Sequence, residues 1–350
     1  MLSGLPPDVE TRRNRQAVTL KQVTGAIRAV YVLELVGLDD RFASYEAGQL
    51  ASGVELIAPG IATADALGPR IGQAGYIRHI SELVGTTSAA RDEMRALLAE
   101  TTIDRSGSAA VRARRIRGAA GDTQAVERDL GTILVDHGFS IDLDTPDHEL
   151  RVAISGDRCV LGWKQRSLEQ GFSGREPTDR PFFRPGSMDP RLARGIVNIA
   201  GAGPGQIVCD PMCGTGGLLL EAALVGASVL ASDIDRTMIA GTRDNLAALA
   251  PEADAHVFRG DAAQLAIRDD RADVIVFDAP YGRQSHVRSQ GPAELVSDAL
   301  VEAARITNRA VIVTDRPLAQ PLPNDWTVTA SFEHRVHRSL TRSVHVLGRG

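Results

Sequence analysis

The stretch "QIVCDPMCGTGGLLLEAALVGASVLASD", residues 206–233, decides the fold. Apolar β-forming residues end at Asp210, a glycine-rich turn follows, and a helical run from Gly217 leads to a second apolar segment that ends at Asp233. Short strands that alternate with helices in this way form a parallel sheet with helices on both faces. We therefore predict a Rossmann-like α/β domain over residues 188–350.

Acidic residues follow the expected strands of this domain. In a parallel sheet the carboxyl ends of the strands meet at one edge, and ligands bind there. The acids at these positions are Asp210, Asp233, Asp261, Asp278 and Asp315. A single strand often ends in Asp for solubility or for helix capping. Several acids behind consecutive strands instead favour a ligand site.

The glycine-rich turn narrows the choice of ligand. Gly214, Gly216 and Gly217 allow the backbone to turn tightly and to approach a bound molecule. A dinucleotide fingerprint requires another glycine where this chain has Leu219, and a phosphate-binding P-loop requires a lysine that is missing here. The turn therefore predicts a ligand without a pyrophosphate.

The neighbouring acids suit an adenosyl group. Asp233 ends the second strand and is placed to bind a ribose diol, with Asp235 as the alternative. Asp261 closes the third strand, where it is placed to read an adenine amino group, and Asp210 borders the glycine turn. S-adenosylmethionine fits this arrangement best.

A second motif, "VIVFDAPYGR" at residues 274–283, points to the reaction. The amine of a nucleic acid base is a poor nucleophile because its lone pair is delocalised into the ring. The Asp278 carboxylate and the backbone carbonyl of Ala279 or Pro280 can accept both amine hydrogens and direct the lone pair at a methyl group. Tyr281 offers a face on which a base stacks. The alternative interpretation is a capped strand followed by a proline turn with a core tyrosine.

The residues before this domain divide into further units. Residues 1–28 are polar and are expected to form an arm, and 29–101 read as a mixed α/β subdomain. Residues 102–165 contain a strand, an amphipathic helix and a hairpin, and 166–187 are rich in Gly, Pro, Arg and Ser, as in a linker.

Two basic clusters stand out. The first lies in the alternating strand "GSAAVRARRIRG", and its members are Arg112, Arg114, Arg115 and Arg117. Arginines on a strand face can contact RNA phosphates, whereas a solvated strand edge is the alternative. The second cluster lies in the last hairpin, and its members are His334, Arg335, His337, Arg338 and Arg342. A solvated hairpin is an equally good interpretation of this second cluster.

Composition sets further limits. The formal net charge of −5 argues mildly against a nucleic acid partner, although basic residues cluster locally. No apolar run reaches about 18 residues, so no membrane span is expected. The three cysteines, Cys159, Cys209 and Cys213, suit a reducing cytoplasm and supply no metal ligand set.

The motifs "DPMCGTGG", "SDID" and "FDAPYGR" resemble those of amino-methyltransferases, in which the fourth motif reads Asp/Asn-Pro-Pro-Tyr. "RPFFRPGSMDPRLARGIVNIAG" more closely resembles the archaeal tRNA guanine-10 N2-methyltransferases, which join an RNA-binding THUMP domain to a Rossmann-like catalytic domain. "AAVRARRIRG" and "PDHELRVAISGDRCVLGW" are similar to the THUMP core. The chain departs from the wider class at Ala279, where proline is common.

The resemblance implies methylation of the N2 amine of a guanosine in tRNA, with S-adenosylmethionine as the methyl donor. The amine motif by itself also allows methylation of adenine N6 or of a protein glutamine. An RNA-binding scaffold without catalysis is a third reading, which the intact Asp278 and glycine turn oppose. The sequence leaves open the number of methyl groups, the oligomeric state and any partner subunit.

Overall fold

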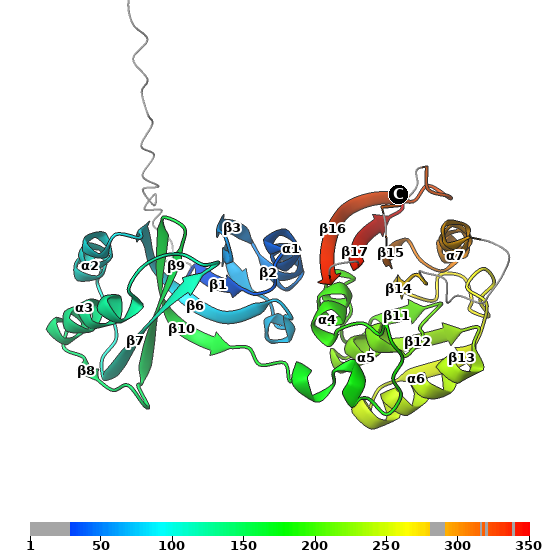
Figure 1. Ribbon diagram of the computed structural model, residues 1–350, viewed down its shortest axis with the longest axis horizontal. Helices are drawn as coiled ribbons and strands as arrows, with labels where there is room; N and C mark the ends of the chain where they lie inside the picture. Colours follow the sequence, from blue (N-terminus) through cyan, green and yellow to red (C-terminus); the bar gives the residue numbers. More distant parts are fainter. Residues whose placement is uncertain (1–28, 281–290, 316, 319–320, 338–339) are drawn as a thin grey trace, which may run out of the picture.

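The computed structural model describes residues 29–280, 291–315, 317–318, 321–337 and 340–350. These residues form two lobes that lie side by side, with the segment after β10 leading from one to the other (Figure 1). The arm predicted at residues 1–28 lies outside the described residues.

The N-terminal lobe is built on an eight-stranded sheet with the order β3-β4-β1-β6-β10-β9-β7-β8. Its strands are β1 (Tyr31–Leu35), β3 (Glu55–Ala58), β4 (Ile61–Ala64), β6 (Ile77–Ser88), β7 (Ser108–Ile116), β8 (Ser140–Ile141), β9 (His148–Ser155) and β10 (Arg158–Ser167). A separate pair joins β2 (Ala51–Ser52) to β5 (Ala66–Leu67). The helices are α1 (Asp40–Leu50), α2 (Arg91–Glu100) and α3 (Thr123–Asp136).

Local sequence signals account for these elements. Asp39 caps α1 by accepting hydrogen bonds from the amides of Arg41 and Phe42, and Asp122 caps α3 in the same way. Gly156 adopts a positive φ of 59° in the turn between β9 and β10, as expected for a tight hairpin.

One long strand joins the two units that the sequence suggested for this lobe. The 12-residue strand β6 pairs with β1 on one side and with β10 on the other. The strands of residues 29–101 and of 102–165 consequently form one sheet. Helix α2 lies in the first of these ranges, yet its Met94 and Leu98 pack in the core of the second.

The C-terminal lobe is a seven-stranded sheet with the order β13-β12-β11-β14-β15-β17-β16. Its strands are β11 (Ile207–Asp210), β12 (Ser228–Asp233), β13 (Ala255–Arg259), β14 (Val274–Asp278), β15 (Arg309–Thr314), β16 (Thr327–His337) and β17 (Leu340–Gly348). The first five are parallel, and the β16–β17 hairpin adds an antiparallel edge.

Helices cover both faces of this sheet, which confirms the predicted α/β class. They are α4 (Pro190–Ile199), α5 (Gly217–Leu224), α6 (Arg236–Leu249) and α7 (Pro292–Ile306). Apolar residues of α4, α5 and α6 pack on one face, and α7 packs on the other. The strand order reverses between β11 and β14, and ligand sites of such sheets lie at this reversal.

A shared apolar core holds the two lobes together. Helix α1 packs against α4, and Phe42 of α1 lies edge-on to Tyr76 and to Phe332 of β16, with ring centroids 5.0 and 5.4 Å apart. Gly195 of α4 faces these rings, because a Cβ atom there would lie 2.6 Å from Phe42. This close approach requires glycine at position 195.

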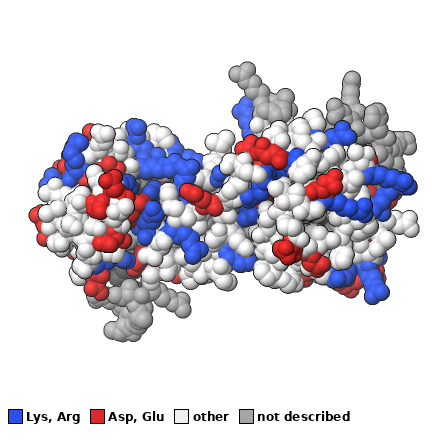
Figure 2. All heavy atoms as spheres, turned by 90° about the horizontal axis from the view of Figure 1, so that it is seen from below, with Lys and Arg blue, Asp and Glu red and all other residues white. Residues whose placement is uncertain are grey.

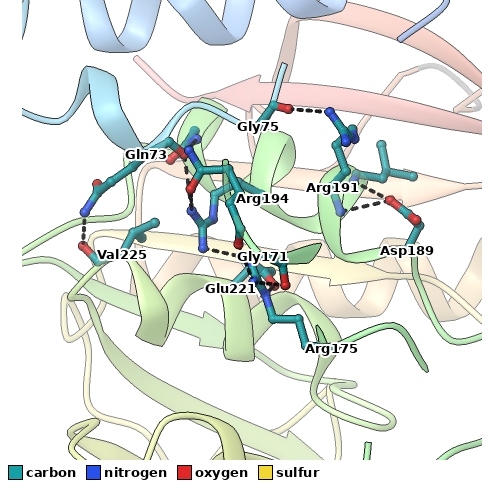
Figure 3. Close-up of polar contacts among 12 residues, drawn as sticks. Gln73, Gly75, Gly171, Arg175, Asp189, Arg191, Arg194, Glu221 and Val225 are labelled. Carbon is teal, nitrogen blue, oxygen red and sulfur yellow. Dashed lines mark hydrogen bonds and ion pairs between the residues drawn. The ribbon is translucent and has the colours of Figure 1, made fainter. Parts of the chain in front are cut away.

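Buried polar contacts reinforce the same junction (Figure 3). Arg194 of α4 pairs with Glu221 of α5 at 2.7 Å and donates to the carbonyl of Gln73 in the other lobe. Arg175, from the predicted linker, also pairs with Glu221, whose side chain has no exposed surface. Arg175 therefore bonds the predicted linker to the C-terminal lobe, whereas residues 166–167 belong to β10 of the N-terminal lobe.

Candidate active site

Three acids meet at the carboxyl edge of the parallel sheet. Asp210, Asp233 and Asp278 end the adjacent strands β11, β12 and β14. Each lies two residues after an apolar residue of the core that α4, α5 and α6 cover, so side-chain alternation turns all three acids to that face. Asp261 follows β13 and forms an isolated bridge with Gln264.

The glycine turn wraps closely around Asp233. Gly214 has a φ of +54°, and its amide donates to Asp233 Oδ2 at 2.9 Å. Gly216 has a φ of +78°, and a Cβ atom there would lie 2.8 Å from Thr242. Gly217 begins α5. Positive φ and close approach both favour glycine at position 216.

Asp233 and Asp235 have different local roles. The second oxygen of Asp233, Oδ1, accepts the amide of Asp235 at 2.9 Å. Asp235 is the N-cap of α6, and its carboxylate accepts the amide of Thr237 at 2.7 Å. Asp233 therefore borders the glycine turn directly, whereas Asp235 terminates a helix.

The crowding of these acids makes the site receptive to positive charge and to hydrogen-bond donors. Burial raises the pKa of Asp210 well above its usual value, and the charges of Asp233 and Asp278 add to this effect, while the amide of Met212 opposes it. Burial also raises the pKa of Asp233, against the two amides that its carboxylate accepts. A cationic ligand would relieve this repulsion.

The segment just before α4 belongs to this site, which sequence reasoning missed by treating it as linker. Asn245 of α6 accepts the amide of Phe182 at 2.8 Å and donates to the carbonyls of Phe182 and Thr215 at 2.9 Å. The hydroxyls of Ser187 and Thr215 lie 3.0 Å apart. The segment 182–187 is thus clamped to the glycine turn. The sequence signal was the conformationally restricted "FFRPGS" next to the α4 N-cap.

The predicted amine-binding loop is partly described. Ala279 continues β14 by donating to the Val313 carbonyl at 2.9 Å, and Pro280 follows with its fixed φ. Tyr281 lies outside the described residues. Arg342 belongs to the second basic cluster, for which a solvated hairpin was one of two equal interpretations. It is buried, and its Nη2 atom lies 3.1 Å from Asp278 Oδ2.

The predicted RNA-binding arginines, three in β7 and Arg117 directly after it, differ in their contacts. Arg112 donates to the carbonyl of Leu143, and Arg117 pairs with Asp40, so both have partners within the protein. Arg114 and Arg115 are exposed, and they border a groove of about 260 Å³ together with Arg117 and with Arg78 of β6.

This groove connects to the junction between the lobes. Arg78 and Arg114 also line a larger hollow of about 640 Å³ that extends to Arg191 of α4. Burial and the charge of Arg78 both lower the pKa of Arg114. Figure 2 shows Lys and Arg residues spread over both lobes and over their junction on the face in view. Such a surface suits an extended polyanion.

Other chemistries find little support in the described part of the chain. Cys209 and Cys213 are buried, and burial raises the thiol pKa of Cys213 well above its usual value. No group of three His, Cys, Asp or Glu residues in the described ranges is arranged to hold a metal ion. No described helix has the length and apolar character needed to cross a membrane.

Comparisons with known proteins agree with this geometry. The family described as "RMKL-like, methyltransferase domain" matches residues 177–343, and the THUMP domain family matches 91–164. A tRNA (guanine(10)-N2)-dimethyltransferase of Methanothermobacter thermautotrophicus is 35% identical, over 92% of this chain and 94% of its own. A tRNA (guanine(6)-N2)-methyltransferase of Thermus thermophilus is 32% identical, over 63% of this chain and 67% of its own. The crystal structure of TrmN from Thermus thermophilus has a TM-score of 0.54 at 24% identity, covering 92% of this chain and all of that one.

The fold and the matched domains define a methyltransferase with a Rossmann-like domain preceded by a THUMP-containing region. This confirms the fold class predicted from the sequence. The chain belongs to the archaeal tRNA (guanine(10)-N2)-methyltransferase family, as the predicted resemblance implied.

Proposed function

We propose that the chain transfers a methyl group from S-adenosylmethionine to the N2 amine of a guanosine in tRNA. The observation that carries this proposal is the position of Asp278, which ends β14 beside the glycine turn and directly before Ala279 and Pro280. A carboxylate and a conformationally fixed carbonyl are thereby adjacent to the predicted cofactor site.

The cofactor is proposed to lie across the ends of β11, β12 and β13. Asp233 accepts the ribose hydroxyls, since its oxygens have lone pairs beyond the two amide contacts. Asp261 accepts from the adenine amino group. The turn with Gly214, Gly216 and Gly217 allows close approach of the ligand. Asp210, whose ionised form is disfavoured by burial and by its acidic neighbours, would ionise more readily beside the cationic sulfonium and ammonium groups.

The transfer follows from these placements. The Asp278 carboxylate and the carbonyl of Ala279 or Pro280 accept the two hydrogens of N2, while Tyr281 stacks on the guanine. When bound, S-adenosylmethionine would supply the methyl group and keep the C–S bonding electrons as a neutral thioether, while Asp278 and the loop carbonyl hold the N2 lone pair toward the methyl carbon. The amine is then cationic and releases one proton, through Asp278, to solvent.

RNA is proposed to bind across the N-terminal lobe. Arg112, Arg114 and Arg115 of β7 and Arg117 directly after it are the proposed phosphate contacts. Arg114 and Arg115 are favoured because they are exposed and line the groove, whereas Arg117, which also lines it, pairs with Asp40. The shared apolar core and the buried polar contacts at the junction fix the two lobes relative to each other. RNA bound to the N-terminal lobe therefore places a nucleotide at a fixed distance, within reach of the C-terminal lobe.

We further propose that the chain is organised as an arm, a subdomain, a THUMP core, a linker and a catalytic domain, at 1–28, 29–101, 102–165, 166–187 and 188–350. Helix α2 packs on the THUMP core across the limit at 101, and β10 extends to Ser167 across the limit at 165. The cytoplasm is the proposed compartment, with which the three free cysteines are compatible. Guanosine 10 is the proposed target, with one or two methyl groups added.

Substituted tRNA transcripts test the substrate and the position together. Transcripts that carry adenosine in place of guanosine 10 or guanosine 6 are incubated with enzyme and labelled S-adenosylmethionine. Loss of label only with the position 10 change is the expected result. Loss only with the position 6 change would move the target to the site named for the second relative. Full labelling of both transcripts would contradict the proposed target.

A further inference from the structure

The terminal hairpin brings a buried arginine to the acid of the amine-binding loop. Asp278 pairs with Val313 of β15, and Val313 pairs with Val344 of β17. Arg342 precedes Val344 by two residues, so it points to the same face of the sheet as Asp278. Arg342 therefore reaches across β15 at the edge where the strand-end acids lie.

One nitrogen of this arginine joins two parts of the site. Its Nη2 atom lies 3.1 Å from Asp278 Oδ2 and donates to the carbonyl of Gly186 at 2.8 Å. The Arg342 side chain is only 3% exposed, whereas that of Asp278 is 23% exposed. Burying a guanidinium without partners costs much free energy. The two contacts of Arg342 therefore compensate for its burial and fix its position in the fold.

We propose that Arg342 is a positioning residue for methyl transfer, which holds the Asp278 carboxylate in the orientation that accepts the amine. This inference rests on the proposed function and adds a residue to its site. Arg342 acts through Asp278 and does not itself contact the base.

The first part of this role is geometric. The terminal torsion of an aspartate side chain is broad, so a carboxylate without a fixed contact samples many orientations. Contact between Arg342 and Oδ2 narrows this range. Acceptance of an amine hydrogen requires a specific distance and angle, and a small misplacement of the reacting groups slows an enzyme strongly.

The second part links the acid to the methyl donor. Gly186 lies in the segment 182–187, which Asn245 clamps to the glycine turn. Arg342 bonds to both Gly186 and Asp278. It thereby fixes the position of the amine-accepting carboxylate relative to the segment that borders the proposed cofactor site. The nitrogen and the methyl carbon are thus aligned before they react.

The third part is electrostatic. Asp278 lies at the same edge of the sheet as Asp210 and Asp233, and its charge contributes to the raised pKa of Asp210. The cation of Arg342 offsets the repulsion that an ionised Asp278 experiences among these acids. The guanidinium thereby places a positive charge beside the carboxylate that is proposed to accept the amine.

Single-turnover methylation of tRNA tests this role. Arg342→Met is compared with Arg271→Met, which removes the same charge from an exposed residue before the amino end of β14. We expect Arg342→Met to slow methyl transfer about 10- to 100-fold, the scale at which partners that orient active groups act. Its affinity for S-adenosylhomocysteine and the Arg271→Met rate should stay close to wild type, and Arg342→Lys should recover part of the rate.

A double-mutant cycle separates positioning from general damage. If Arg342 acts through Asp278, Arg342→Met should cause little further loss in an Asp278→Asn background. Additive losses, or a wild-type rate in Arg342→Met, would overturn the inference. If Arg342→Met fails to fold, Arg342→Lys decides by the same rate and affinity criteria. A wild-type enzyme that makes no N2-methylguanosine would instead refute the proposed function.

Discussion

Substitution of Asp233 by Asn provides a sharp test of the cofactor site. Both carboxylate oxygens already accept backbone amides, from Gly214 and from Asp235, and the proposed ribose hydroxyls use the remaining lone pairs. Asn removes the charge and places an NH₂ group against one of the amide donors. The lost charge-assisted hydrogen bonds are worth about 1.5–3 kcal/mol. The expected weakening of S-adenosylhomocysteine binding is therefore roughly 10- to 150-fold.

Asp235→Asn is the matched control. Asp235 caps α6, and Asn is about as good an N-cap as Asp, so the helix and the binding affinity should both be preserved. Isothermal titration calorimetry of the two variants gives the comparison. Wild-type affinity in Asp233→Asn would refute the reasoning, and a loss confined to Asp235→Asn would move the ribose contact to that residue.

The pH dependence of binding gives a second readout of the same residue. Burial raises the pKa of Asp233, so this group takes up a proton at a higher pH than an ordinary aspartate. The protonated form is a poorer acceptor, and wild-type affinity should therefore fall as the pH drops through the raised pKa. Asp233→Asn should lack this component. Identical pH profiles for the two proteins would contradict the placement.

Three further changes test the junction, the charge of the site and the RNA surface. Gly195→Ala forces a Cβ against Phe42 and should destabilise the protein by about 1–3 kcal/mol; an unchanged melting temperature would show that the contact relaxes freely. Burial raises the folded-state pKa of Asp210, so stability falls as pH rises from the usual aspartate pKa through that raised value. Asp210→Asn should therefore raise the melting temperature at neutral pH, and a lower one would contradict the sign. Neutralising Arg114 and Arg115 together should reduce the slope of log binding constant against log salt concentration for tRNA by about 1.4–1.8. An unaltered slope would mean that the two arginines contact only solvent.

Sequence reasoning succeeded where local patterns decide structure. The helical run expected from Gly217 is α5, and the strand expected to end at Asp278 is β14. The apolar periodicity and the end signals of each element lie within a short stretch of sequence. Asp233 was also placed correctly at the end of its strand, whereas the capping role of Asp235 emerged only from the structure.

The features that the sequence did not reveal depend on contacts between segments that lie far apart in the chain. Arg342 lies in a basic stretch whose burial the sequence left open, and only the folded sheet brings it to Asp278. The segment 166–187 has the composition of a linker, yet Arg175 and Arg180 are largely buried against α5. The local sequence does not encode such tertiary partners, because charge and composition alone do not reveal burial.

Mass analysis of tRNA nucleosides tests the central claim most directly. Wild-type enzyme and Asp278→Asn are each incubated with tRNA and S-adenosylmethionine, and the digested nucleosides are identified. The wild type should yield N2-methylated guanosine, and Asp278→Asn should yield it about 10²- to 10⁴-fold more slowly while still binding S-adenosylhomocysteine. The appearance of N6-methyladenosine or 5-methylcytidine without N2-methylated guanosine, or a near-normal rate in Asp278→Asn, would contradict the account.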